Sequence, residues 1–337
     1  MTAPHTPSSQ HPQPAPGELR LLSLNAHAWL EEHQIPKLYR IAQAILDWDV
    51  DVVALQEVNQ SQATPEVAYA DLEATHFLGG NERPIREDNY AWLLVRILRQ
   101  LGAEDVQWAW ADAHLGFGVY DEGIAVVTRR PAGRVVRLPH AEGFDYDNVR
   151  RRVSLGVEVL PTRTGTAGEE AGLWVVSGHY SWWEDPAFSD VVQGFPIGAP
   201  KPGADKYLFR AEWEFLAPQF AELAQSAPVV LAGDYNNAAS VAGEGYDLVV
   251  GGEVSGPWAD SFLTASDVRG EGTVHKKIHG WAENTAALRI DYVFSSPGVR
   301  ATRHAVVFGD DTPEAVSDHS GLLVDLRAEG AGAVSPR

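Results

Sequence analysis

The sequence predicts an α/β protein: a four-layer sandwich of two packed, mixed β-sheets flanked by helices. The first observation is a set of short apolar segments rich in β-branched residues, which is typical of strands buried on both faces. They span residues 19–27, 51–58, 122–130, 152–160, 173–180, 228–236, 288–296, 301–308 and 321–328. The second observation is that helical patterns separate some of these segments. Two sheets packed face to face, with helices outside, would bury all of them.

Three helices are predicted by apolar residues that recur at helical spacing. We expect these residues to pack in the core. They are Ile35, Leu38, Ile41, Ala42 and Ile45, then Leu93, Leu94, Ile97, Leu98 and Leu101, then Phe209, Trp213, Leu216, Phe220 and Leu223.

One domain over residues 18–327 is expected. The length of 337 residues would allow two domains at ~150 residues each, but no linker, repeat or shift in composition divides the chain. Residues 1–17 are rich in Pro, Ser and Gln and predict a disordered tail, and residues 328–337 predict another. Residues 184–205 predict a long functional loop, and residues 238–257 a second loop at the same rim.

Composition narrows the class of protein. There is no cysteine, which excludes disulfides, thiolate metal sites and a cysteine nucleophile. No apolar segment resembles a signal peptide or a membrane span, so a cytoplasmic protein without membrane contact is expected. The formal charge of -20 disfavours nucleic acid as the main partner, although metal ions can supply local positive charge.

Polar residues recur at the ends of the predicted strands. They are Asn25, Glu57, His179, Asp234, Asn236, Asp291, Asp318 and His319. A charged side chain attached to a buried segment is costly unless it is paired or bound to metal. Asp, Glu and Asn offer the hard oxygen ligands that suit Mg²⁺, with Mn²⁺ as a substitute. Histidines beside them can move protons near neutral pH. This pattern predicts a metal-dependent catalytic pocket.

Six motifs, taken in their order along the chain, resemble those of the endonuclease/exonuclease/phosphatase superfamily. They are LSLNAHAW, ALQEV, GHYSWW, GDYNN, RIDYVFSS and VSDHSG. The resemblance covers residues 20–327 and implies a four-layer α/β fold and phosphoester hydrolysis. It implies that Glu57 is the principal Mg²⁺ ligand, with Asn25 and Asp318 also at the metal. It further implies that Asp234 and Asn236 position the nucleophile and bind the phosphate or a second metal.

The resemblance also assigns the acid–base residues. His319 would activate the attacking water or hold the phosphate, and Asp291 would orient it. His179 matches a second catalytic histidine, with Glu122 as its carboxylate partner. No covalent intermediate is needed, because the metal polarises a phosphoryl oxygen and stabilises the leaving oxygen.

An arginine is expected to contact the phosphate. Arg152 occupies the expected position, and the alignment leaves Arg151 as the alternative.

The substrate must be predicted from peripheral residues. Four segments resemble the maltose-6'-phosphate phosphatase branch of this superfamily: DNYAWLLV, YDEGIAVVT, GHYSWW and HGWAENTAALRIDYVF. This resemblance implies that the substrate is a small sugar phosphate. Trp182, Trp183, Tyr90 and His279 would then line a sugar pocket, although one tryptophan of the pair could be core. We expect His27 to be structural.

Three other functions stay open. A DNA or RNA nuclease of the same superfamily would use the same chemistry, but no basic stripe interleaved with aromatic residues supports it. A sphingomyelinase-like phosphodiesterase is disfavoured because no signal peptide and no exposed apolar hairpin is evident. A non-catalytic binding protein is disfavoured because all the catalytic positions are filled. No obligate protein partner is evident.

Overall fold

The computed structural model describes residues 11–160, 172–188, 198–202, 204, 206–275 and 286–329. The first sheet has the strand order β11 (Asp267–Arg269), β13 (Val299–Val307), β14 (Gly321–Ala328), β1 (Glu18–Asn25), β2 (Val52–Gln56), β5 (Tyr120–Thr128) and β3 (Gln60–Ser61), with β4 (Gln107–Gly116) also paired to β5. The second has the order β10 (Ala259–Asp260), β12 (Asp291–Ser295), β9 (Val229–Asp234), β8 (Leu173–His179), β7 (Val153–Val159) and β6 (Ala132–Pro139).

Both sheets are mixed, as expected. Strand β1 runs parallel to β2 and antiparallel to β14. Strand β8 runs parallel to β9 and antiparallel to β7. Every strand predicted from the sequence is present. Strands β4 and β6 were not predicted, nor were the short strands β3, β10 and β11.

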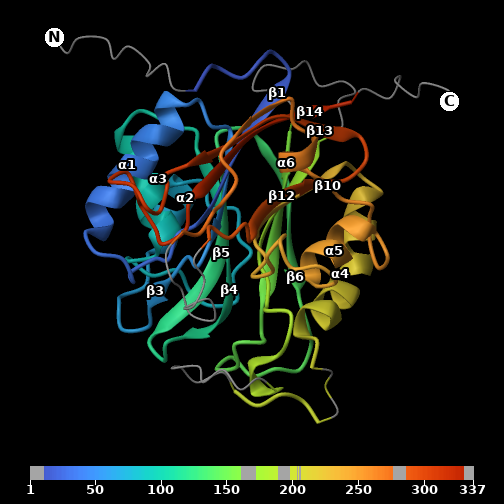
Figure 1. Ribbon diagram of the computed structural model, residues 1–337. Coiled ribbons are helices and arrows are strands. Elements are labelled where there is room, and N and C mark those ends of the chain that lie inside the picture. Colours follow the sequence, from blue (N-terminus) through green and yellow to red (C-terminus); the bar gives the residue numbers. More distant parts are fainter. Residues whose placement is uncertain are drawn as a thin grey trace.

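Helices cover the outer face of each sheet. They are α1 (Gln34–Asp47), α2 (Tyr69–Ala74), α3 (Tyr90–Gln100), α4 (Leu208–Ala224), α5 (Gly245–Gly251) and α6 (Ser261–Thr264), with a 3₁₀ turn, η1 (Pro186–Phe188). Figure 1 shows α1, α2 and α3 on one side of the strands and α4 and α5 on the other. The four-layer sandwich is therefore confirmed.

Three apolar clusters hold the layers together. Between the sheets, Leu21 and Val126 pack with Val157 and Val175. Residues of α1 and α3 pack on the first sheet, and residues of α4 and α5 on the second. Fully burying one such aliphatic side chain contributes about 1.5–3 kcal/mol, so the strand ends project from a rigid frame.

The strand directions bring many chain segments to one edge of the sandwich. Strands β1, β2, β8 and β9 end at this edge, while β5, β7, β12 and β14 begin there. The two sheets share this edge, because Asn25 at the end of β1 donates a hydrogen bond to Asp234 at the end of β9. The polar residues predicted at strand ends therefore meet.

Some details differ from the sequence predictions. Ile35 and Leu101 are 45% and 40% exposed, because each lies at the end of its helical pattern, beyond the face that packs on the sheet. Residues 238–257 are not simply a loop, because they contain α5. Within the expected N-terminal tail, His11 packs edge-on against Trp48 at 4.7 Å. The described helices include none with the length and apolar character that crossing a membrane requires.

Candidate active site

Three residues at this edge have a left-handed backbone. The φ angles of His27, Glu57 and Asn236 are 42°, 49° and 50°. Each follows the end of a strand, and the turn directs its side chain back over the sheet edge. Non-glycine residues in this region are uncommon, cost on the order of 1–3 kcal/mol each and gather at functional sites. These turns hold the three residues at the edge where the polar side chains meet.

Two glycines allow β8 and β9 to approach closely beside it. Gly233 precedes Asp234, has a φ of 155°, and a Cβ there would lie 1.8 Å from the carbonyl oxygen of Gly178. A Cβ on Gly178 would in turn lie 2.6 Å from the ring of Tyr180. Because His179 pairs in register with Asp234, this close approach sets the spacing of the two side chains.

His319, Asp291 and Asp234 form one buried group. The Nδ1 atom of His319 lies 2.9 Å from Oδ2 of Asp291, and its Nε2 atom lies 3.7 Å from Oδ2 of Asp234. All three residues are at most 4% exposed. The expected pairing of Asp291 with His319 is present in this geometry, and Asp291 and Asp234 are direct neighbours between β12 and β9.

Glu57, His179 and Asp234 form a second group. The Nε2 atom of His179 lies 4.0 Å from Glu57 and 3.7 Å from Asp234. Asn236 places its side-chain nitrogen 3.1 Å from His179. Asn25 donates from its amide nitrogen to Glu57 at 2.9 Å and to Asp234 at 3.1 Å, while its oxygen accepts from the backbone of His27. In this arrangement Asn25 bridges the carboxylates of Glu57 and Asp234.

Glu122 lies between two imidazoles. One carboxylate oxygen is 3.6 Å from Nδ1 of His179 and 3.6 Å from Nε2 of His114. His114 is paired in register with Glu122 between β4 and β5 and is 4% exposed. His114 was not among the predicted site residues. The strict alternation of alanine with larger residues from Trp108 to His114 is the signal that indicates β4.

Arg152, and not Arg151, reaches the site. It is 5% exposed and donates to the carbonyl oxygen of His179 at 3.2 Å, and its guanidinium lies 5.5 Å from the ring of Trp182. The Nε atom is buried without a hydrogen-bond partner among the described residues. Arg151 turns away and pairs with Glu82 at 2.6 Å. The register left open by the sequence thus favours Arg152.

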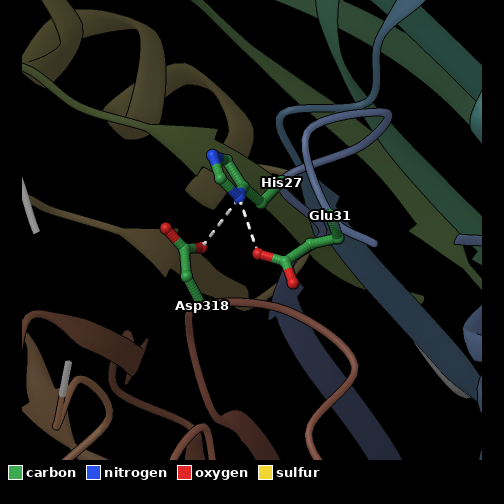
Figure 2. A group of neighbouring side chains, drawn as sticks. All are labelled: His27, Glu31 and Asp318. Carbon is green, nitrogen blue, oxygen red and sulfur yellow. Dashed lines mark hydrogen bonds and ion pairs between the residues drawn. The ribbon is translucent and has the colours of Figure 1, made fainter. Parts of the chain in front are cut away.

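Asp318 belongs to a third group, drawn in Figure 2. Its Oδ1 atom lies 3.4 Å from Nδ1 of His27, and the same nitrogen lies 2.9 Å from Oε1 of Glu31. The other oxygen of Glu31 accepts from Lys37 at 2.6 Å. His27, which the sequence predicts to be structural, lies between these two carboxylates at the site edge.

The residues predicted to bind the substrate differ in their burial and position. Trp182 is half-buried beside Arg152. Trp183 packs against the core next to α4, with its ring 5.1 Å from that of Tyr207. Tyr90 is fully buried in the apolar cluster on the first sheet, and its ring packs edge-on against Trp29. His279 lies outside the described residues.

The β4–β5 turn lies at the same edge and contradicts one sequence inference. No exposed apolar hairpin was evident from the sequence. In the structure the turn exposes 51% of Phe117 and 51% of Val119. A lipid-like substrate therefore has to be included in any activity screen.

Comparison with known proteins identifies the family. Residues 28–319 match the Endonuclease/Exonuclease/phosphatase family. The chain belongs to this family. Its members are metal-dependent phosphoester hydrolases, among them phosphatases and nucleases. No curated protein matches the chain.

Solved structures of this family share the fold. An endonuclease/exonuclease/phosphatase family protein from Leptotrichia buccalis is 26% identical, with a TM-score of 0.69, and the match covers 92% of this chain and 99% of that one. A mannosyl-6-phosphatase from Bacteroides thetaiotaomicron is 16% identical, with a TM-score of 0.57 over 91% and 99% of the two chains. TDP2 from Caenorhabditis elegans is 14% identical, with a TM-score of 0.53 over 92% and 98%.

The electrostatics of the family site favour a bound cation. Burial raises the pKa of Glu57, and the Glu122 carboxylate adds to the shift. Burial likewise raises the pKa of Asp234, and the Asp291 carboxylate adds to it. Crowded buried carboxylates repel one another, and a divalent ion removes that repulsion.

The two central histidines have opposite pKa shifts. Burial disfavours the charged ring of His319, but the carboxylates of Asp291 and Asp234 outweigh burial and hold its pKa well above its ordinary value. Burial, with the guanidinium of Arg152, lowers the pKa of His179 to about 4. The two imidazoles therefore differ in how readily they take up a proton, a difference suited to acid–base chemistry.

The donor set fits a divalent metal. Glu57, His179 and Asp234 each offer one ligand atom, and these atoms lie within 4.8 Å of one another. Asp234, Asp291 and His319 form a second such set, which shares Asp234. Carboxylate oxygens suit Mg²⁺ and Mn²⁺, and the imidazoles add affinity for Mn²⁺.

Proposed function

We propose that this protein is a Mg²⁺-dependent phosphatase that hydrolyses a small sugar phosphate, with Mn²⁺ as a substitute ion. The observation that carries the proposal is the set of buried carboxylates, two imidazoles and one buried guanidinium at a single edge of the sandwich. A phosphoryl group is the ligand that needs both a cation and a guanidinium.

The roles of the residues follow from their contacts. The cation, held by Glu57 with Asp234 in reach, would polarise a phosphoryl oxygen and stabilise the leaving oxygen. His319 takes the proton of the attacking water at Nε2, because Nδ1 is already bonded to Asp291. This bond keeps the ring in one orientation and stabilises its charged form.

The phosphoryl oxygens would be bound from the side of β7 and β8. Arg152 presents a guanidinium whose Nε atom is buried and free to donate. Asn236 donates from its amide nitrogen to the carbonyl oxygen of Tyr180 at 2.9 Å and lies 3.1 Å from His179, which is held between Asn236 and Glu122. Charge that develops on the phosphoryl oxygens would meet the fixed guanidinium of Arg152 without reorganisation.

The charge of the chain favours a small substrate over a nucleic acid, since a formal charge of -20 disfavours a long polyanion. The guanidinium of Arg152 lies over the ring of Trp182 at 5.5 Å, so a sugar or a base attached to a phosphate at Arg152 would lie near Trp182. The mannosyl-6-phosphatase shares only the fold with this chain, so it adds no evidence on the substrate.

A phosphate-release screen tests this proposal. It should cover disaccharide and monosaccharide phosphates, nucleotides, inositol phosphates and phospholipid head groups, with Mg²⁺ and with Mn²⁺. We expect one sugar phosphate to be hydrolysed fastest. Rapid nicking of supercoiled DNA at low enzyme, abolished in Glu57→Ala, would instead establish a nuclease.

Two tryptophan variants separate recognition from folding. Trp182→Leu should raise KM for the sugar phosphate by about 10-fold, the loss of ~1–3 kcal/mol of ring stacking, with little change in stability. Trp183→Leu is the matched control and should lower stability but leave KM unchanged, because Trp183 packs on the core. An unchanged KM in Trp182→Leu would remove Trp182 from the substrate site.

A further inference from the structure

We propose that His114 positions the ring of His179 through Glu122, an inference that rests on the proposed function because all three residues belong to one site. His114 is 4% exposed, and its Nε2 atom lies 3.6 Å from Oε1 of Glu122. The same oxygen lies 3.6 Å from Nδ1 of His179. One carboxylate oxygen is therefore shared by two buried imidazoles, which approach it from different strands.

A shift in the register of β4 against β5 places His114 opposite Glu122. Asp112 pairs with Gly123, so a regular ladder would put Ala113 opposite Glu122. The register shifts by one residue at this point, and His114 takes that place instead. Bulges of this kind are common beside active sites, where they redirect a side chain. The shift is the local feature that brings a second imidazole to Glu122.

The contacts of the two imidazoles determine which ring nitrogens carry protons. Asn236 places its amide nitrogen 3.1 Å from Nε2 of His179, so Nε2 accepts and Nδ1 carries the proton that faces Glu122. Burial lowers the pKa of His114 to about 4, although the Glu122 carboxylate opposes this shift. The neutral ring of His114 has one proton, which faces the carboxylate only if it is on Nε2. Nδ1 of His114 is buried with no hydrogen-bond partner among the described residues, so it holds the lone pair.

Two N–H groups directed at one oxygen restrict where the Glu122 side chain can point. Gly116 restricts it from another side, because a Cβ there would lie 3.0 Å from Oε2 of Glu122. A distance of 3.6 Å is longer than a hydrogen bond, and catalytic contacts of this kind often shorten when substrate binds. His114 thus keeps Glu122 directed at His179, and it does so as a neutral group that adds no charge beside Arg152.

Hydrolysis by two variants separates this role from simple packing. The substrate is the phosphate ester that the release screen finds to be hydrolysed fastest. His114→Phe fills the space without a donor, and we expect kcat to fall about 10- to 100-fold with KM changed less than about threefold. His114→Gln keeps an N–H near the position of Nε2 and should restore kcat to within about threefold of wild type. Equal losses in the two variants, or no loss in His114→Phe, would overturn the inference.

A matched control measures the effect of lost packing alone. His304 is also buried, with a pKa lowered to about 4 and one ring nitrogen without a partner in the described part of the chain. Its neighbours are Ser261 and Phe262 on α6 rather than residues of the site. His304→Phe should therefore lower stability in urea and leave kcat unchanged. A fall of kcat as large as that in His114→Phe would attribute both losses to packing and overturn the inference.

A double variant tests whether His114 acts through Glu122. Once Glu122→Gln has removed the carboxylate, adding His114→Phe should lower kcat no further, because the two residues work as one unit. A double variant slowed by the product of the two single losses would show that His114 acts independently of Glu122, against the inference. Circular dichroism checks that each variant is folded. If His114→Phe does not fold, His114→Leu, which also lacks a donor but is smaller, takes its place.

Crystal structures of the variants provide a test that needs no hydrolysis. In His114→Gln we expect Oε1 of Glu122 to stay within about 3.6 Å of Nδ1 of His179, as in the wild type. In His114→Phe we expect Glu122 to turn away from His179. If no phosphate ester is hydrolysed but Glu122 moves in this way, the proposed function fails and the positioning by His114 stands. If a sugar phosphate is hydrolysed but Glu122 does not move in His114→Phe, the proposed function stands and this inference fails.

Discussion

Asp291→Asn is the substitution that tests the acid–base assignment most sharply. The carboxylate bonds to Nδ1 of His319 at 2.9 Å, and both residues are 4% exposed. A buried hydrogen bond to a charged group contributes about 1.5–3 kcal/mol. Since 1.36 kcal/mol is a factor of ten, this loss alone lowers the rate about 10- to 150-fold.

The asparagine also changes the proton on the ring. Its amide nitrogen would donate to Nδ1, which places the ring proton on Nε2 and leaves no base there. Including this effect, we expect kcat to fall by about 10²–10⁴. The pKa of His319 should also fall, because the Asp291 carboxylate holds it up. A base works deprotonated, so the acid limb of the kcat/KM profile should move to lower pH.

The assay is metal-dependent hydrolysis of the best substrate from the phosphate-release screen, measured from pH 5 to pH 9. Asp267→Asn, an exposed carboxylate on β11, is the control and should match the wild type. A kcat within threefold of wild type, with the acid limb unmoved, would refute the pairing of Asp291 with His319 as a working unit.

Three further substitutions test the frame of the site. Gly233→Ala should lower the free energy of unfolding in urea by at least about 3 kcal/mol, since its Cβ would meet the carbonyl of Gly178. A loss under 1 kcal/mol would contradict the close approach of β8 and β9. Glu212→Gln should cost about 1.5–3 kcal/mol at pH 7, because Glu212 accepts two hydrogen bonds from Ser181. Burial opposes ionisation of Glu212, but His140, Arg152 and Ser181 together outweigh burial and lower its pKa. This stability is therefore present above pH 4.5, and the difference from wild type should close as pH falls further. Burial lowers the pKa of His304 to about 4, so the unfolded chain takes up a proton between pH 6.5 and 4 that the folded chain does not. Wild type should therefore lose about 2 kcal/mol more than His304→Gln from pH 7 to pH 5, and equal losses would show that His304 is not buried in its neutral form.

The sequence was informative where a polar residue interrupts an apolar strand. A carboxylate or imidazole at the end of a strand buried on both faces is costly unless it has a partner or a metal. This cost allowed four site residues to be predicted: Glu57, His179, Asp234 and Asp291. Parallel and antiparallel pairing then determines that such ends meet at one edge of the sandwich. Chemistry of this kind can be predicted before the fold is known in detail.

Other features depend on packing that no local pattern reveals. His114 lies within β4, a strand of alternating alanine and large residues that lacks the β-branched character of its neighbours, and it joins the site only through its pairing with Glu122. Strand β6 is an exposed edge strand with arginines, so its apolar pattern is weak. Tyr90 shares a motif with the expected substrate residues but faces the core.

The sequence also did not reveal the orientation of side chains. Arg151 and Arg152 are neighbours of the same type, and only the strand register of β7 decides which faces His179. Asp318 is close enough for its charge to act on Glu57, and it also lies against His27, because the turn after β1 brings that imidazole across the edge. A single left-handed residue, such as His27, redirects a side chain in a way that residue spacing does not predict.

Hydrolysis by Glu57→Gln, compared with wild type under matched metal conditions, tests the central claim most directly. Chelator-stripped protein would be assayed across phosphomonoesters and phosphodiesters, with and without added Mg²⁺ or Mn²⁺. We predict hydrolysis by wild type only when metal is added, and a fall of at least about 10²-fold in the folded variant, since a neutral amide replaces the expected principal ligand. Equal rates in the variant and wild type, or full activity without metal, would contradict a metal-dependent phosphoesterase centred on Glu57.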